Sequence, residues 1–198
     1  MLPIRPIPPI LTPTKHALRQ HLRERLRTLD PAFIAAASQQ IAAHICSHVR
    51  QNVDRVIALF GGLRNEPDLL PHLLPALKSQ GACLALFQID SAELHPRRIE
   101  SLDDLQRGPM HVWEPKPHCP RLDIAALDLI LVPGLAFTRD GARLGRGGGY
   151  YDRLLANPAC RAQRIAIAFD LQIIDHIPVE PHDQFVHQII TESSVHQC

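Results

Sequence analysis

The stretch Asp128-Leu-Ile-Leu-Val-Pro133 is the strongest strand signal in the chain, and the expected fold is worked out from it. A continuous apolar run of this length is typical of a strand that is buried on both faces, as in a parallel sheet. Three similar runs at 55–60, 83–87 and 164–169 predict further buried strands. A last short strand is expected within 185–191.

Helical patterns lie between these strands. Leu18, Leu22 and Leu26 recur at helical spacing, and Thr14 before them is a suitable N-cap. Strands that alternate with helices predict an α/β protein, namely a three-layer sandwich with a mostly parallel central sheet. The segment 88–127 is expected to be less regular, with a turn at Trp113-Glu114-Pro115. The expected helices are 15–29, a segment that begins at Asp30-Pro31, 68–80 and 150–156. Pro75 argues against the helix at 68–80, because it would remove a backbone hydrogen bond.

The length of 198 residues fits one domain, at ~150 residues per domain. We expect this domain to span 15–198, after a flexible proline-rich arm over 1–14, MLPIRPIPPILTPT. Lys and Arg number 21 against 20 for Asp and Glu, and a net charge of +1 argues against non-specific nucleic-acid binding. No apolar stretch approaches the ~20 residues of a membrane span. We therefore expect neither nucleic acid nor membranes as partners, and we also expect a monomer.

The five cysteines, at positions 46, 83, 119, 160 and 198, are widely spaced and form no CxxC pair. This spacing argues against a zinc ribbon and a thioredoxin motif, and it favours a reducing compartment. The first residues lack the continuous apolar core of a secretory signal. A cytoplasmic location is therefore expected.

The chemically informative segment is Arg143-Leu-Gly-Arg-Gly-Gly-Gly-Tyr-Tyr-Asp152, between a buried strand and a helix. Glycines permit a sharp turn and let a ligand approach the main chain closely, and a helix start offers free N–H groups to phosphate. Arg143 and Arg146 can bind phosphate or carboxylate oxygens, while Asp152 can hold Mg²⁺. The segment predicts a phosphate site; the alternative is a purely structural glycine turn.

Better-known motifs do not fit this segment. A P-loop ends in Gly-Lys-Ser/Thr, where this chain has Gly149-Tyr-Tyr151. The dinucleotide pattern needs a glycine where Tyr150 or Asp152 stands. The GxSxG nucleophile elbow is absent from the sequence as well.

Charged residues outside the segment give weaker signals. Lys15 and Arg19 lie four apart on one helix face and can grip an anion, although such a pair is more often simply solvated. Glu66 follows the first strand, at the edge where parallel α/β sheets bind ligands, and can equally be an ordinary loop acid. Asp183 can join Asp152 in an oxygen-rich magnesium site.

Val132-Pro-Gly-Leu-Ala-Phe137, Asp140-Gly141 and the run 143–153 together resemble the signature of the 5-formyltetrahydrofolate cyclo-ligase (methenyltetrahydrofolate synthetase) family. The resemblance covers roughly residues 15–192. Segments elsewhere agree in the same order, namely Lys15-His-Ala-Leu-Arg19, 59–66, Trp113-Glu-Pro115, 168–172, 177–183 and 190–192.

The resemblance implies an ATP- and Mg²⁺-dependent ligase that converts 5-formyltetrahydrofolate to 5,10-methenyltetrahydrofolate, ADP and phosphate. In such a reaction the γ-phosphoryl group of ATP moves to the formyl oxygen, N10 of the folate attacks the formyl carbon, and phosphate leaves. The implied fold is like that of the sugar-isomerase and CoA-transferase (NagB/RpiA/CoA transferase-like) group.

The resemblance also assigns roles to residues of this chain. Arg146 and Tyr150 are the implied catalytic residues, and Asp152 and Asp183 hold the metal. The implied ATP contacts are Lys15, Arg19, Arg143, Leu144, Gly145, Arg146, Gly147, Gly148, Gly149, Tyr150 and Tyr151. The implied folate contacts are Gly61, Glu66, Trp113, Arg146, Gly147, Gly148, Gly149 and Tyr150.

Two departures from the family pattern leave an alternative open. Gln88 and Ile89 stand where the family usually has a proline, and Phe60-Gly61-Gly62 is unusually rich in glycine. We expect the glycines to widen or loosen the folate cleft. The alternative function is a folate- or nucleotide-binding paralogue without turnover.

Overall fold

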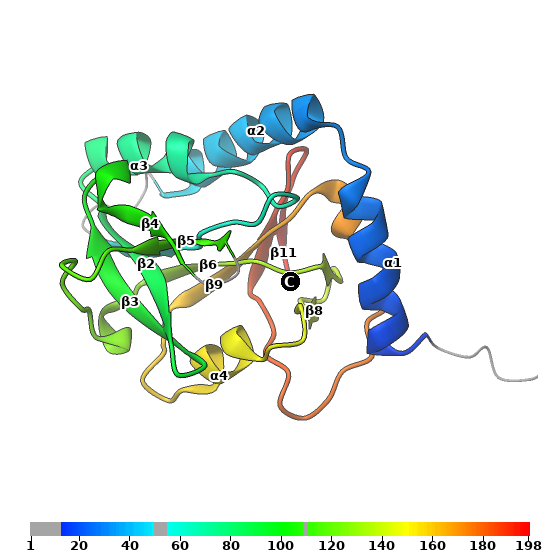
Figure 1. Cartoon of the computed structure of the whole chain (residues 1–198). Helices are drawn as coiled ribbons and strands as arrows, with labels where there is room; N and C mark the ends of the chain where they lie inside the picture. The colour runs from blue at the N-terminus through cyan, green and yellow to red at the C-terminus, as the bar shows by residue number, and fades with distance from the viewer. Residues whose placement is uncertain (1–12, 50–54, 109–110) are drawn as a thin grey trace, which may run out of the picture.

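One sheet of seven strands forms the centre of the computed structural model, which describes residues 13–49, 55–108 and 111–198 (Figure 1). The two edge strands run antiparallel to their neighbours, and the five strands between them are parallel. In sheet order the strands are β11 (Val195–Gln197), β10 (Gln188–Ile190), β9 (Gln163–Ile167), β6 (Leu129–Val132), β1 (Val56–Leu59), β2 (Cys83–Asp90) and β3 (Glu93–Ile99).

The helices begin where the sequence places their caps. The Thr14 hydroxyl accepts a hydrogen bond from the Ala17 N–H, and Asp30 Oδ1 accepts one from Ala32. The third helix continues through Pro75, because its buried leucines pack against the second helix and the sheet. The four helices of the described residues are α1 (Lys15–Arg27), α2 (Pro31–Val49), α3 (Leu70–Ser79) and α4 (Tyr150–Ala156).

The sheet is buried on both faces, which confirms the expected three-layer α/β sandwich. Ile57 and Leu59 of β1 belong to the core shared with α1, α2 and α3, whereas Ala58 between them belongs to the core that contains Leu154 and Leu155 of α4. Figure 1 shows α2 and α3 together along one side of the sheet and α4 on the other. Alternate side chains of one strand therefore enter two cores, which is why the strands read as continuous apolar runs.

The expectation of a less regular segment over 88–127 is wrong. The strand β2 continues to Asp90 and turns back as β3, and Trp113–Pro115 is the strand β5, paired with β4 (Leu105–Arg107), instead of a turn. Buried positions alternate with less buried ones from Glu93 to Arg97, but Pro96, Arg97 and Arg98 hide this alternation in the sequence. Proline is tolerated because β3 is an edge strand.

Smaller elements also differ from the expectation. The loop between β6 and α4 contains a short hairpin of β7 (Ala136–Phe137) and β8 (Arg143–Leu144), and β11 follows the expected last strand. Short 3₁₀ helices occur at η1 (Leu102–Asp104), η3 (Ile124–Ala126) and η4 (Asp170–Gln172). The arm expected at 1–14 lies outside the described residues except for Pro13 and Thr14. Within the described residues no helix is long and apolar enough to cross a membrane.

Candidate active site

The candidate site lies where the direction of the sheet's strand order changes. The chain runs outward from β1 to β2 and β3 on one side, and from β6 to β9 and β10 on the other. Open α/β sheets bind ligands beside the carboxyl ends of the strands at such a switch point. The segment 60–66 follows β1 here, and Pro133 follows β6. A cavity of about 400 Å³ opens at this place, within the size range of small-molecule sites.

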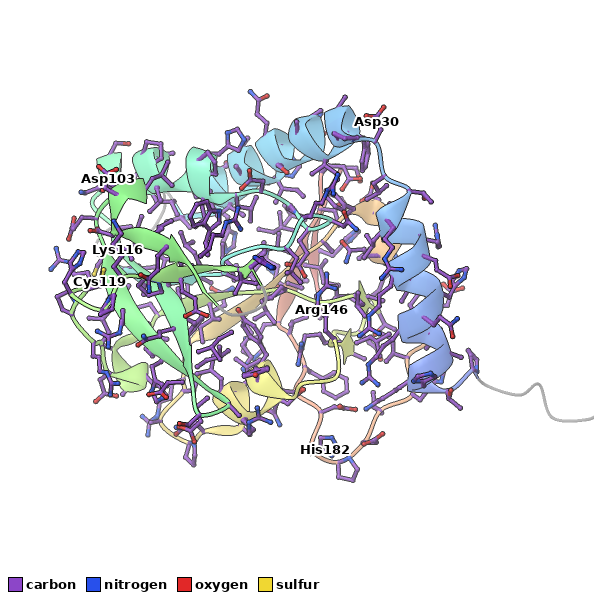
Figure 2. All side chains as sticks on the ribbon, in the orientation of Figure 1. Asp30, Asp103, Lys116, Cys119, Arg146 and His182 are labelled. Atoms are coloured by element: carbon purple, nitrogen blue, oxygen red, sulfur yellow. The ribbon has the colours of Figure 1, made fainter. Side chains whose placement is uncertain are left out.

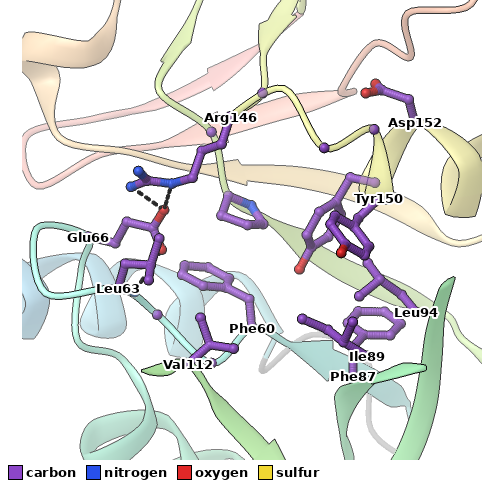
Figure 3. Close-up of a pocket in the computed structure, with 18 of the residues that line it drawn as sticks. Phe60, Leu63, Glu66, Phe87, Ile89, Leu94, Val112, Arg146, Tyr150 and Asp152 are labelled. Carbon is purple, nitrogen blue, oxygen red and sulfur yellow. Dashed lines mark hydrogen bonds and ion pairs between the residues drawn. The ribbon is translucent and has the colours of Figure 1, made fainter. Parts of the chain in front are cut away.

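The cavity has two unlike sides (Figure 3). One side, called the apolar wall below, consists of Phe60, Phe87, Ile89, Leu94, Val112 and Trp113. The other side comes mainly from residues 143–152, called the glycine loop below, together with Glu66 and Arg23. Such a cavity can hold a flat apolar ring system on one side and an anionic group on the other.

Glu66 and Arg146, 80 positions apart, form an ion pair at the cavity. Glu66 Oε1 accepts hydrogen bonds from Arg146 Nε at 2.8 Å and lies 2.7 Å from Arg146 Nη2 (Figure 3). Glu66 Oε2 accepts a further hydrogen bond from the Leu63 N–H at 2.9 Å. The Glu66 side chain is 6% exposed and that of Arg146 is 34% exposed, so the arginine is the more accessible of the two partners that line the cavity.

A second ion pair joins Arg143 to Asp152 within the glycine loop. Arg143 Nη2 donates to Asp152 Oδ1 at 2.5 Å, and the Arg143 side chain is almost completely buried. Arg143 Nε has no hydrogen-bond partner among the described residues. A predicted ATP contact and a predicted metal ligand thus touch each other, and the guanidinium holds the carboxylate in place.

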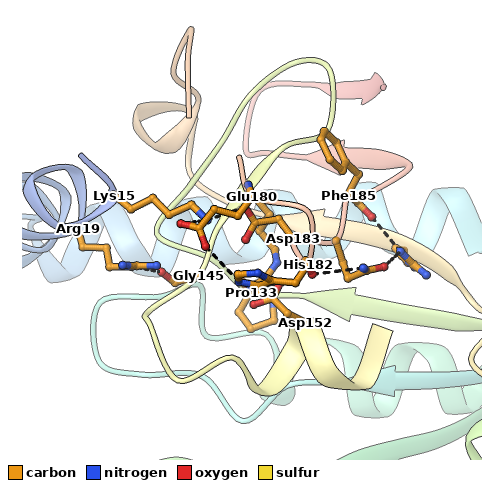
Figure 4. Close-up of polar contacts among 12 residues, drawn as sticks. Lys15, Arg19, Pro133, Gly145, Asp152, Glu180, His182, Asp183 and Phe185 are labelled. Atoms are coloured by element: carbon orange, nitrogen blue, oxygen red, sulfur yellow. Dashed lines mark hydrogen bonds and ion pairs between the residues drawn. The ribbon is translucent and has the colours of Figure 1, made fainter. Parts of the chain in front are cut away.

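Helix α1 fastens the glycine loop through its main-chain carbonyls. Arg19 Nε donates to the Gly145 carbonyl at 3.0 Å, and Arg23 Nη2 donates to the Arg146 carbonyl at 2.8 Å (Figure 4 shows the first contact). These bonds fix the orientation of the loop in which Arg146 pairs with Glu66. Gly147, directly after the two contacted residues, has φ +105°, a conformation that glycine adopts at no steric cost.

Lys15 and Asp183 form a third ion pair, and it connects α1 to the loop near the carboxyl end (Figure 4). Lys15 Nζ donates to Asp183 Oδ2 at 2.5 Å and lies 3.4 Å from Glu180 Oε1. Burial by itself raises the pKa of the Asp183 carboxyl, but the bond from Lys15 and the Glu180 N–H outweigh it, so the pKa lies below its ordinary value. Asp183 is therefore ionised at neutral pH.

The two predicted metal ligands fit a magnesium ion in their chemistry. Each carboxylate keeps one oxygen, Oδ2 of Asp152 and Oδ1 of Asp183, that accepts no hydrogen bond from the described residues. Neither belongs to a cluster of three potential metal ligands in the described part of the chain. Mg²⁺ needs no such cluster, because it usually takes one or two carboxylates, several waters and substrate phosphates.

Gly61 brings two main chains into close contact beside the cavity, a role that the sequence did not predict. A Cβ atom on Gly61 would lie 2.0 Å from the Trp113 carbonyl oxygen, so only glycine allows the two main chains to meet. The Trp113 N–H donates to the Gly61 carbonyl at 3.3 Å. The Arg107 guanidinium lies 3.8 Å from the centre of the Trp113 ring, which orients the ring beside the cavity.

The structure brings most of the predicted site residues to the cavity, though not all. Leu144 is buried in the core, where its carbonyl accepts a bond from Leu135, and Gly147, Lys15, Arg19 and Asp183 do not line the cavity. Burial raises the pKa of the Tyr151 hydroxyl far above its ordinary value, and the charge of Glu66 adds to the shift. This hydroxyl is therefore a hydrogen-bond donor and not a base. The predicted residues that line the cavity are Gly61, Glu66, Trp113, Arg143, Gly145, Arg146, Gly148, Gly149, Tyr150, Tyr151 and Asp152.

Sequence reasoning missed Arg23 and five of the six residues of the apolar wall. Arg23 continues the four-residue spacing of Lys15 and Arg19, which is a signal that points to it. The wall residues Phe87, Ile89 and Leu94 come from the β2–β3 hairpin that the sequence did not reveal. A single aliphatic residue in an unrecognised strand carries no local sign of a ligand.

The parallel sheet, the switch-point cavity and the cationic glycine loop define an α/β protein whose cavity suits an anionic small molecule with an apolar ring. Comparisons with known proteins give the class more sharply. The model of the 5-formyltetrahydrofolate cyclo-ligase family matches residues 11–192. The mouse 5-formyltetrahydrofolate cyclo-ligase is 30% identical over 193 residues, which cover 91% of this chain and 94% of the mouse protein.

Two further proteins agree with this result. The mitochondrial 5-formyltetrahydrofolate cyclo-ligase of Arabidopsis thaliana is 36% identical over 207 residues, covering 91% of this chain and 75% of the plant protein. The solved structure of 5,10-methenyltetrahydrofolate synthetase from Aquifex aeolicus superposes with a TM-score of 0.80 at 27% identity, covering 92% of both chains. The chain belongs to the 5-formyltetrahydrofolate cyclo-ligase family.

Proposed function

We infer that this chain is an enzyme that converts 5-formyltetrahydrofolate to 5,10-methenyltetrahydrofolate with ATP, releasing ADP and phosphate. Membership of the family supports the reaction. The observation that carries the inference for these residues is the Glu66–Arg146 pair, which lines the same cavity as the apolar wall. This is the place where a pterin ring and a phosphoryl group would have to meet.

The apolar wall is the side on which the folate ring would bind. Phe60, Trp113 and the β2–β3 hairpin offer flat and aliphatic surfaces, and Glu66 at their border offers carboxylate oxygens to the N–H groups of the ring. Because Glu66 is buried and already oriented by the Leu63 N–H, it can accept such bonds without rearranging.

The glycine loop is the side on which ATP would bind. A formamide oxygen is a weak nucleophile, so positioning and charge stabilisation dominate its phosphorylation. Arg146 is accessible from the cavity and can stabilise the charge on the phosphoryl group as it moves to the formyl oxygen. Tyr150 and the main chain of 145–149 would border the same group, and Lys15 and Arg19 would bind the nucleotide from α1. Attack by N10 on the formyl carbon then expels phosphate.

Asp152 and Asp183 are the residues that would hold Mg²⁺. When bound, the ion would neutralise part of the charge of the ATP phosphates. Arg143 and Lys15 orient the two carboxylates, since each cation bonds one carboxylate oxygen and leaves the other free.

The test is an assay of the full-length chain with ATP, MgCl₂ and 5-formyltetrahydrofolate. We expect the absorbance of the methenyl product to rise and ADP to form in equal amount, with no product when either ATP or Mg²⁺ is omitted. A chain that binds both substrates, by thermal-shift measurement, without forming product would favour the non-catalytic paralogue. Product formed in the presence of excess chelator would contradict the role of Mg²⁺.

Other properties belong to the same proposal. We expect a monomeric enzyme that works in the cytoplasm on small molecules and binds neither nucleic acid nor membranes, with a single domain over 15–198. A fold like that of the sugar-isomerase and CoA-transferase group likewise stays a prediction. Size-exclusion chromatography with light scattering would test the oligomeric state.

A further inference from the structure

A second group of potential ligands lies away from the candidate active site. An oxygen of the Asp104 carboxylate, a ring nitrogen of His118 and the Cys119 sulfur all lie within 4.8 Å of one another. It is the one cluster of three His, Cys, Asp or Glu side chains at metal-binding distance within the described residues. Figure 2 shows Cys119 at one edge of the molecule, far from Arg146.

The Asp104 carboxylate is held in a fixed orientation. Its Oδ2 accepts hydrogen bonds from the Glu100 N–H at 2.6 Å and the Ser101 N–H at 3.2 Å, because Asp104 caps η1. The other oxygen, Oδ1, lies 3.3 Å from His118 Nε2. Oδ2 thus accepts main-chain hydrogen bonds, and Oδ1 faces the imidazole.

The other two side chains come from the segment that follows β5. Its main chain is anchored, since the Lys116 N–H donates to the Asp104 carbonyl at 2.7 Å and the Cys119 N–H donates to Lys116. Cys119 is 2% exposed, whereas the His118 side chain is 65% exposed. The thiol therefore lies on the inner side of the cluster, and the imidazole lies on the solvent side.

A separate cavity makes the cluster accessible. It has a volume of about 360 Å³ and is lined by Arg98, Glu100, Asp104, His118, Cys119 and Pro120. The neighbouring cations are engaged elsewhere. Arg98 and Lys78 pair with Glu100, Lys116 Nζ donates to the Asp103 carbonyl, and Arg97 donates to the Cys119 and Pro117 carbonyls. These cations therefore bond other groups, while the Cys119 thiol donates a hydrogen bond to the Asp104 main-chain carbonyl at 3.7 Å.

We propose that Asp104, His118 and Cys119 form a binding site for a zinc-like transition-metal ion. Sulfur and imidazole nitrogen with one carboxylate oxygen match the ligands of Zn²⁺, whereas Mg²⁺ requires oxygen ligands. Three protein ligands leave a fourth position for water. On binding, the Cys119 thiol releases its proton to solvent, so thiolate and carboxylate together balance the two charges of the ion.

The bound ion would connect η1 to the segment after β5. That strand carries Trp113 of the apolar wall, and β5 pairs with β4 directly after η1. The ion would therefore brace the support of the wall without touching the substrates. This proposal does not depend on the catalytic function, because it concerns a separate cavity.

Cobalt(II) is a suitable probe, because tetrahedral Co²⁺ bound to a thiolate absorbs in the near ultraviolet. Metal-free full-length protein in a non-thiol reductant is titrated with CoCl₂ and then with ZnCl₂. We expect a thiolate-to-cobalt band that saturates at one equivalent, disappears when zinc is added, and is accompanied by a higher melting temperature.

Variants assign the band to its ligands. Cys119→Ser should abolish it, and His118→Ala should weaken cobalt binding at least ~10-fold, because a metal ligand is lost. His118 is exposed, so its replacement should spare the fold. Matched controls are Cys198→Ser, at an exposed thiol, and His72→Ala, at an exposed imidazole; both should bind cobalt like the parent chain. The absence of a band, a band that persists in Cys119→Ser, or unchanged affinity in His118→Ala would each overturn the proposal.

Discussion

The two sides of the cavity differ in how they are held before a ligand arrives. The glycine loop is held by polar contacts that are already formed. Arg146 pairs with Glu66, Arg143 pairs with Asp152, and two arginines of α1 donate to the loop carbonyls. The apolar wall consists of uncharged side chains that line the cavity (Figure 3). The difference is physical, since buried charges require partners and apolar groups do not.

The two sides also differ in which parts of the chain position their side chains. On the glycine loop, partners come from distant segments, 80 positions apart for Glu66–Arg146 and 126 positions apart for Arg19–Gly145. On the apolar wall, three of the six side chains come from one hairpin, β2–β3. The charged side is set by long-range pairing, and the apolar side is set largely by local strand register.

The substitution Arg146→Ala should break the charged side most strongly. Turnover should fall by about 100-fold or more, because a charge aimed at the moving phosphoryl group is lost. Arg146→Lys should recover only part of the activity, since lysine lacks the forked geometry that bonds Glu66. Steady-state kcat for these variants is compared with that of Arg139→Ala, at an exposed arginine outside the cavity. A kcat near that of the parent chain in Arg146→Ala would remove this residue from the mechanism.

The substitution Trp113→Ala tests the apolar wall. Losing a large apolar side chain of a ring site removes about 1.5–3 kcal/mol, which corresponds to a ~10–100-fold higher KM for folate with little change in the KM for ATP. Leu102→Ala, at an exposed apolar residue, is the matched control. If the KM for ATP rises as much as that for folate, the two sides of the cavity are not separate ligand sites.

The substitution Lys15→Ala tests whether α1 belongs to the nucleotide side. We expect the KM for ATP to rise by roughly tenfold, because a bond from a charged donor contributes about 1.5–3 kcal/mol. Arg27→Ala, at an exposed position on the same helix, should leave both KM values unchanged. A rise confined to the KM for folate would show that the helix serves the other ligand.

The substitution Glu114→Gln should give the smallest effect, and only in stability. Burial raises the pKa of Glu114 above 4.5, although a bond from the Ile89 N–H opposes the shift. The folded state therefore favours the protonated Glu114 carboxyl. The stability that this preference contributes is complete below pH 4.5 and is lost as pH rises through the raised pKa of the folded state. Urea unfolding of the parent chain and the variant at several pH values measures this. Equal pH dependence in both proteins would contradict the raised pKa.

Much of the fold is readable from local sequence. The buried strands around 55–60, 128–133 and 164–169, the caps at Thr14 and Asp30, and the helix Tyr150–Ala156 follow from apolar runs, capping residues and glycines. The β2–β3 hairpin escaped because its second strand mixes proline and arginines with buried residues, and its burial pattern arises only when it pairs with β2.

The sequence by itself determined the family and the α/β class, and it predicted the glycine loop as a phosphate site, because these depend on residues that are neighbours in the chain. Only the tertiary structure decided that Glu66 holds Arg146, that Arg23 anchors the loop, and that Gly61 lies against Trp113. The physical reason is that an ion pair or a close main-chain contact depends on distances through space, and these are fixed when the strands β1 and β6 come together.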